Sequence, residues 1–246
     1  MRRFGLIGRS LSHSFSARYF AEKFEREGLS EQCRYDLFEL PEVECVRDML
    51  ASMPELEGYN VTIPYKQQII PLLDELSDEA RNIGAVNCVK VLRDGTLVGY
   101  NTDVDGIRIS LDKLLGGCDI DAALVLGTGG ASQAVQYVLG ERGIPYYIVS
   151  RDAAKGNITY DDLDAAVIDS AHLIINASPV GMYPHHDKAP AIPYEALSSR
   201  HYLFDLVYNP EYTLFLECGA NHGAHTLCGL DMLYAQAESA WEIWNR

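Results

Sequence analysis

The chain has 246 residues, of which 48% are hydrophobic and 22% charged, and its formal net charge is −15. This length suits one large or two smaller α/β domains, and no apolar run approaches the ~20 residues of a membrane-spanning helix. Since the N-terminus also lacks a signal-peptide layout, we expect a cytoplasmic protein. An acidic surface repels phosphate backbones, so neither nucleic acid nor a membrane is an expected partner.

Cysteine and histidine residues give no sign of a metal site. The six cysteines form no CxxC pair, which is typical of reduced thiols inside a cell. The densest group of potential ligands is His185 and His186 in the loop YPHHDKAP, and adjacent side chains point apart. We therefore expect no bound metal.

Apolar runs alternate with helical patterns along the chain, which predicts βαβ units, a mainly parallel sheet and an α/β fold. Strands are expected at 3–8, 34–40, 59–63, 86–92, 97–101, 123–127, 145–150, 173–177 and 203–207. Asp94 and Gly95 form a hairpin signal between the fourth and fifth of these strands. Gly28 suits the position just after the first helix.

Two blocks can be separated. Residues 1–104 form a first α/β block, and a helix at 104–115 leads past Gly116 and Gly117 into a second block, 105–228. The final segment, 229–246, is a helix with four apolar residues on one face: Leu233, Ala237, Trp241 and Trp244. Because that face needs a hydrophobic surface to cover, we expect the helix to complete the first block.

A glycine-rich turn joins the strand at 123–127 to the next helix. Its sequence, GTGGAS, carries Gly127, Gly129 and Gly130, with Ser132 in place of a third glycine of the GxGxxG pattern. Such a loop lets the backbone approach a pyrophosphate while the helix N-terminus supplies free N–H groups. This predicts a Rossmann-type dinucleotide site, although a tight turn without a ligand has the same appearance.

The residues after the strand at 145–150 bear on the choice of cofactor. The strand ends in Ser150 and Arg151, and an arginine here can pair with a 2′-phosphate, which favours NADP. The next residue, Asp152, could instead accept from an unphosphorylated ribose, so NAD remains an alternative.

Polar groups also gather at element ends in the first block. In SHSFS, Ser14 and Ser16 precede a helix whose N–H groups can help them hold a carboxylate. N-capping would explain one hydroxyl but not several. The stretch GYNVTIPYK ends a strand at Lys66, and Asp103 follows another strand. A lysine near a carboxylate can exchange a proton with a substrate oxygen.

Seven motifs together resemble the shikimate dehydrogenases: NVTIPYK, GAVNC, GYNTDVDG, GTGGAS, INASPVGM, FDLVYNPEYT and GLDMLYAQA. They occur in that family's order and cover nearly the whole chain. The resemblance implies a two-domain enzyme, with an N-terminal α/β substrate domain and a Rossmann-type NADP-binding domain. It would reduce 3-dehydroshikimate to shikimate with NADPH, on the route to chorismate and the aromatic amino acids, as a monomer or homodimer.

The resemblance also implies roles for single residues. Lys66 would be the catalytic lysine and Asp103 its partner. Six residues would bind substrate: Ser14, Ser16, Thr62, Asn87, Tyr208 and Gln236. Ten residues would bind the cofactor: Gly127, Gly129, Gly130, Ala131, Ser150, Arg151, Asp152, Lys155, Leu206 and Gly229.

Several positions depart from the family pattern. Cys88 replaces the usual threonine, which puts one polar contact near the substrate in doubt, and Ser150 and Asp152 replace asparagine and threonine around the arginine. No amphipathic helix follows Lys155. Two alternatives stay open: an NAD-using quinate/shikimate dehydrogenase, and a non-catalytic NADP-sensing relative.

Overall fold

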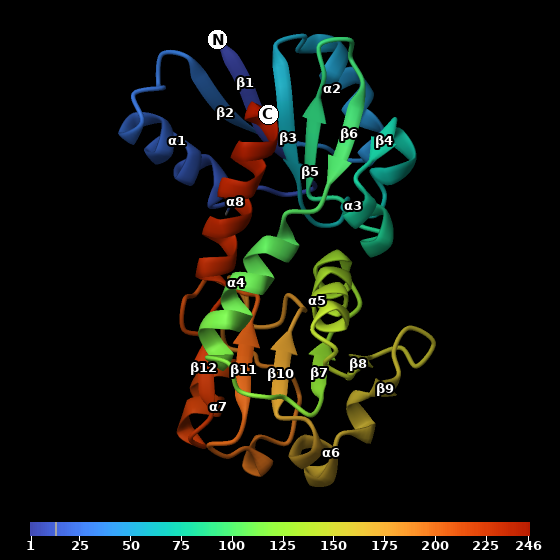
Figure 1. The fold of residues 1–246 in the computed structure, drawn as a ribbon, viewed down its shortest axis with the longest axis vertical. Helices are drawn as coiled ribbons and strands as arrows, with labels where there is room; N and C mark the ends of the chain where they lie inside the picture. The colour runs from blue at the N-terminus through green and yellow to red at the C-terminus, as the bar shows by residue number, and fades with distance from the viewer. Residues whose placement is uncertain (13) are drawn as a thin grey trace. The chain divides into compact units, whose positions relative to one another are not determined.

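The computed structural model describes residues 1–12 and 14–246, which form two compact units (Figure 1). The first unit comprises Met1–Thr102 with Ala237–Arg246, and the second comprises Asp103–Gln236. The division falls inside the last helix, α8 (Leu230–Asn245). Within the described ranges, no helix is long and apolar enough to cross a membrane.

The first unit is built on a mixed six-stranded sheet in the order β2-β1-β3-β5-β6-β4. The strands are β1 (Arg2–Gly8), β2 (Cys33–Glu39), β3 (Leu56–Val61), β4 (Glu75–Leu76), β5 (Cys88–Val91) and β6 (Leu97–Tyr100); the helices are α1 (Ser16–Arg26), η1 (Val43–Cys45), α2 (Val46–Ser52), η2 (Ile70–Leu72) and α3 (Asp78–Ile83). Strand β1 pairs in parallel with β2 and β3, whereas β5 pairs antiparallel with β3 and β6. The predicted hairpin turn is confirmed, with Gly95 at φ +88°.

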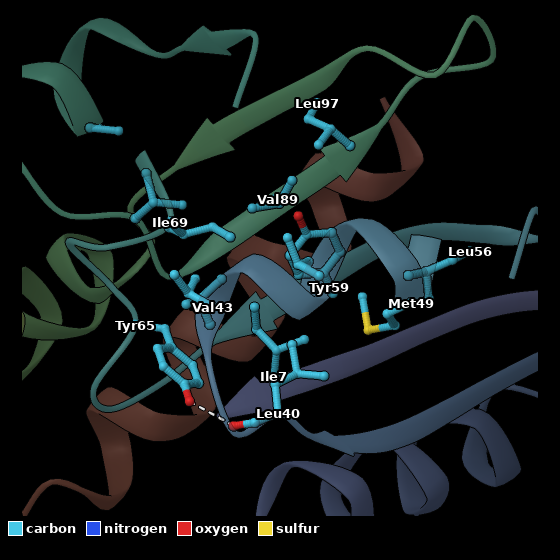
Figure 2. Packing of buried hydrophobic residues seen from close by; sticks show 14 residues of the cluster. Ile7, Leu40, Val43, Met49, Leu56, Tyr59, Tyr65, Ile69, Val89 and Leu97 are labelled. Carbon is cyan, nitrogen blue, oxygen red and sulfur yellow. Dashed lines mark hydrogen bonds between the residues drawn. The ribbon is translucent and has the colours of Figure 1, made fainter. Parts of the chain in front are cut away.

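Two hydrophobic clusters of the first unit explain why its central strands are apolar. In one, Val43 and Met49 pack with Ile7 and Tyr59 (Figure 2). Because both faces are covered, these strands read as nearly continuous apolar runs.

The second cluster joins α1 and the end of α8 to the sheet. Phe4 stacks on Trp244 with ring centroids 4.8 Å apart, and the Trp244 indole donates to the Val89 carbonyl at 3.0 Å. A Cβ on Gly58 would lie 2.3 Å from the Trp244 Nε1, so only glycine lets the indole approach β3 this closely. Cys88 belongs to this cluster and is completely buried.

The second unit has a six-stranded parallel sheet in the order β12-β11-β10-β7-β8-β9. Its strands are β7 (Ala123–Leu126), β8 (Tyr146–Ser150), β9 (Ile158–Thr159), β10 (Leu173–Asn176), β11 (Tyr202–Asp205) and β12 (His225–Leu227); its helices are α4 (Asp103–Leu115), α5 (Gly130–Glu141), η3 (Tyr160–Asp162), α6 (Ala165–Ser170), η4 (Tyr194–Ala196) and α7 (Leu214–Asn221). The chain leaves β7 toward β8 and later returns to β10 on its other side. This reversal is the topological switch point beside which such sheets bind ligands.

The mainly parallel α/β architecture agrees with the sequence prediction, and each of the nine expected strands is present with bounds shifted by at most a few residues. No helix begins directly after Lys155: residues 151–157 form turns and bends that lead to the short edge strand β9, and η3 begins only after that strand. The sequence did not predict β4, β9 or β12, which have two or three residues each.

Candidate functional site

The two serines near the N-terminus lie where α1 begins. Ser16 is the first helical residue, and its N–H donates to the Ser14 Oγ at 3.3 Å. Both side chains are half-buried. Hydroxyl groups beside the first turn of a helix suit an anion, because the dipole and the N–H groups favour negative charge there.

Thr62 and Lys66 lie in the turn that follows β3. The Thr62 N–H donates to the Ile7 carbonyl at 3.0 Å, and the Lys66 carbonyl accepts from the Val86 N–H at 2.7 Å. Between them, the buried Tyr65 anchors the turn by donating its hydroxyl to the Leu40 carbonyl at 2.6 Å, as Figure 2 shows. The half-buried Lys66 is therefore held on a fixed backbone next to the segment that carries Asn87.

The Asn87 side chain is held in one orientation. Its Oδ1 accepts from the Thr102 N–H at 2.7 Å, and its Nδ2 donates to the Thr102 Oγ1 at 3.0 Å. Because a backbone N–H can only donate, the amide cannot be flipped without losing a bond. Asn87 is 1% exposed, so it acts as a fixed polar group and not as a surface residue.

A chain of hydrogen bonds connects the serine turn with Asn87. Tyr35 donates to the Asn60 Oδ1 at 2.8 Å, and the Asn60 Nδ2 donates to the Asn87 carbonyl at 3.1 Å. Burial raises the pKa of Tyr35 well above its usual value, while a hydrogen bond with Ser16 opposes the rise. The sequence prediction missed Tyr35, because a tyrosine within a strand looks like an ordinary core residue.

Cys88 does not extend this polar group. Its side chain packs in the hydrophobic cluster with Phe4 and Trp244, and burial raises the pKa of its thiol. The substitution at this position therefore changes the core of the first unit.

Asp103 is the first residue of α4 and opens the second unit, whereas Lys66 belongs to the first. Asp103 is 2% exposed. Tyr208 and Gln236, two further predicted substrate residues, are half-buried in the second unit.

The glycine loop of the second unit has the shape expected for a phosphate site. Gly127 has φ +116°, a conformation that disfavours other residues, and a Cβ there would lie 3.1 Å from the Ala177 carbonyl. A Cβ on Gly129 would meet open space. Ser132 closes the loop by donating to the Gly127 carbonyl at 2.7 Å. The first turn of α5 thus presents its N–H groups beside an open backbone, which fits a pyrophosphate.

The loop after β8 carries the predicted adenosine-side residues. Arg151, Asp152 and Lys155 are exposed, and Ser150 is buried. The Asp152 carboxylate accepts from the Ala154 N–H at 3.0 Å and lies 3.7 Å from the Lys155 ammonium. Asp152 therefore closes its own turn, and Lys155 offsets its charge.

Leu206 and Gly229 lie at the carboxyl edge of the same sheet. The Leu206 N–H donates to the Asn176 carbonyl at 3.0 Å, and a Cβ on Gly229 would lie 2.3 Å from the Leu206 carbonyl oxygen. Among residues 1–12 and 14–246, no group of three or more metal-ligand side chains could hold a metal ion.

Comparison with known proteins identifies the family. Residues 6–89 match the model of the shikimate dehydrogenase substrate binding domain. The chain is 38% identical to the NADP(+) shikimate dehydrogenase of Clostridium beijerinckii, covering 100% of this chain and 92% of that protein.

Two solved structures are similar over almost the whole chain. Shikimate 5-dehydrogenase from Thermus thermophilus in complex with NADP(H) and shikimate has TM-score 0.86 and 31% identity, covering 99% of this chain and 93% of that one. Quinate dehydrogenase from Corynebacterium glutamicum in complex with NAD has TM-score 0.88 and 27% identity, covering 99% and 93%. The resemblance seen in the seven motifs is confirmed, and the chain belongs to the shikimate dehydrogenase family.

Proposed function

We propose that this protein is an NADP-dependent shikimate dehydrogenase, which reversibly reduces 3-dehydroshikimate to shikimate on the route to chorismate and the aromatic amino acids. The observation that carries the proposal is a set of five polar residues in the first unit that hydrogen bonds hold in place. Ser14, Ser16, Thr62, Lys66 and Asn87 all match the family's motifs, and each takes part, through its backbone or its side chain, in the hydrogen bonds described above. A protein that only senses NADP has no need of this group.

The second unit would hold the cofactor, which when bound supplies the hydride for the carbonyl carbon. Gly127, Gly129, Gly130 and Ala131 would approach the pyrophosphate with their backbone, at the N-terminus of α5. Ser150, Arg151 and Lys155 would contact the adenosine 2′-phosphate, while Asp152 shapes the turn that carries them. Leu206 and Gly229 would line the nicotinamide.

In the proposed chemistry, substrate binding and proton transfer fall to different residues. Ser14 and Ser16 would hold the substrate carboxylate, whereas Thr62, Asn87, Tyr208 and Gln236 would bind elsewhere on the substrate. The Lys66 ammonium would donate the proton that the carbonyl oxygen takes up as the hydride arrives, and stabilise its developing charge. Asp103 would orient Lys66 and accept from a substrate hydroxyl.

We further propose that the first unit binds substrate, that the protein works in the cytoplasm, and that it is a monomer or homodimer. The similarity to an NAD-bound quinate dehydrogenase, together with Asp152, makes an NAD-using quinate/shikimate dehydrogenase the second candidate.

Initial rates with shikimate and quinate, each with NADP+ and NAD+, test both functions. Turnover of shikimate with NADP+ at a rate far above the other three pairs supports the first candidate. Comparable rates with quinate or NAD+ support the second, and failure of all four pairs contradicts both.

A further inference from the structure

A completely buried carboxylate, that of Asp205, lies at the end of β11. Its Oδ1 accepts from the Asn176 Nδ2 at 2.9 Å and from the Val207 N–H at 3.0 Å, and its Oδ2 accepts from the Thr213 Oγ1 at 2.6 Å. Asn176 and Thr213 are also completely buried. Three donors from different parts of the chain therefore converge on one side chain.

These bonds fasten two neighbouring loops to each other. Asn176 ends β10, and its side chain also donates to the Val180 carbonyl at 3.1 Å and accepts from the Ser178 hydroxyl at 2.7 Å. Val207 and Thr213 belong to the loop that follows β11. Both loops leave the carboxyl edge of the sheet, where ligands of open α/β sheets bind.

Leu206 is held between these contacts. Its own N–H donates to the Asn176 carbonyl at 3.0 Å, and the N–H of the next residue, Val207, donates to Asp205. The Val207 carbonyl in turn accepts from the Gly229 N–H at 3.2 Å. The Leu206 backbone is thus fixed on both sides, and Asp205 supplies one of the two acceptors.

We propose that Asp205 is a positioning residue for the nicotinamide end of the cofactor: its carboxylate joins the loops after β10 and β11 and so holds Leu206 in place against the ring. This inference rests on the proposed function, which assigns Leu206 to the nicotinamide. Asp205 itself acts through Leu206 and is not proposed to touch the ring. Arg151, at the adenosine end of the cofactor site, is not one of the hydrogen-bond partners of Asp205.

Two ligands allow binding at the nicotinamide end and at the adenosine end to be measured separately. NADP+ carries the nicotinamide, whereas adenosine 2′,5′-bisphosphate occupies the Arg151 end alone. Calorimetric titration of Asp205→Ala should show the NADP+ affinity reduced by about 10-fold, which corresponds to the net contribution of about one hydrogen bond. The affinity for the bisphosphate should change by less than about 2-fold. Asp205→Asn should recover most of the loss, because its oxygen can serve Asn176 and Val207 while its amide donates to Thr213.

Asp164→Ala is the matched control. It removes another acidic side chain of the second unit, the cap of α6 that accepts from the Val167 N–H at 2.9 Å, and should leave both affinities unchanged. If Asp205→Ala fails to fold, Thr213→Val removes one donor of the group and should give a smaller loss with the same selectivity.

Equal losses of both ligands, or an unchanged NADP+ affinity, would overturn the positioning role. Wild-type protein that binds neither ligand would instead overturn the proposed function, and this inference with it.

Discussion

The buried carboxylate of Asp205 should make the stability of the protein depend on pH. Burial raises the pKa of Asp205 from 3.8 to about 6, although its hydrogen bonds with Thr213, Val207 and Asn176 oppose the rise. The folded protein therefore holds this proton more tightly than the unfolded chain does. The stabilisation is complete below about pH 4 and is lost as the pH rises through about 6.

One pKa unit corresponds to about 1.4 kcal/mol, so the rise corresponds to about 3 kcal/mol. Asn imitates the protonated carboxyl group and does not titrate. For Asp205→Asn, the unfolding free energy relative to wild type should therefore increase by about 3 kcal/mol between about pH 4 and about pH 7. Other carboxylates titrate equally in both proteins and cancel in this difference.

Urea denaturation followed by far-ultraviolet circular dichroism measures the effect. Both tryptophans, Trp241 and Trp244, belong to the first unit, so their fluorescence does not report directly on the second. Stability profiles of the two proteins that stay parallel between about pH 4 and about pH 7 would refute the titration of Asp205 in this range.

Three further substitutions test other parts of the account. Gly58→Ala forces a Cβ against the Trp244 indole and should cost about 1–3 kcal/mol in urea denaturation followed by tryptophan fluorescence; an unchanged midpoint would show that the indole can move away. Asn87→Asp keeps an acceptor for the Thr102 N–H but loses the amide donor, so the KM for shikimate should rise about 10-fold or more, with little change in the KM for NADP+. An unchanged KM for shikimate would exclude Asn87 from substrate binding. Asp152→Ala removes an exposed negative charge and should raise the ratio of kcat/KM for NADP+ to kcat/KM for NAD+, by less than about 10-fold. The increase should be smaller at high salt, because salt screens exposed charges. A fall in the ratio would mean that the Asp152 turn itself supports phosphate binding.

Much of the fold could be predicted from the sequence because its central strands are buried on both faces. Runs such as ALVL in β7 and LII in β10 are completely buried, so their apolar character is unbroken and easy to recognise. The two-residue strands β4 and β9 are too short to show any period, and tertiary pairing alone creates them. The glycine loop was predictable because both its flanking elements and its backbone requirement are local.

The polar groups that support the site could not be predicted in the same way. Tyr35 joins Asn60 across 25 positions, and Asp205 joins Asn176 across 29, so each pair exists only after the strands are placed side by side. Cys88 was a different case, because the threonine that is usual at this position in the family suggested a polar contact near the substrate. Strand alternation instead directs its side chain into the core.

The most direct test of the proposed chemistry is the steady-state oxidation of shikimate with NADP+ by wild-type protein and by Lys66→Ala. The wild type should turn over, and the variant should lose about 10²–10⁴-fold in kcat with a smaller change in KM, because it lacks the positioned proton donor. A variant with unchanged kcat and a raised KM would make Lys66 a binding group only. A wild type with no turnover would contradict the assignment of a shikimate dehydrogenase activity altogether.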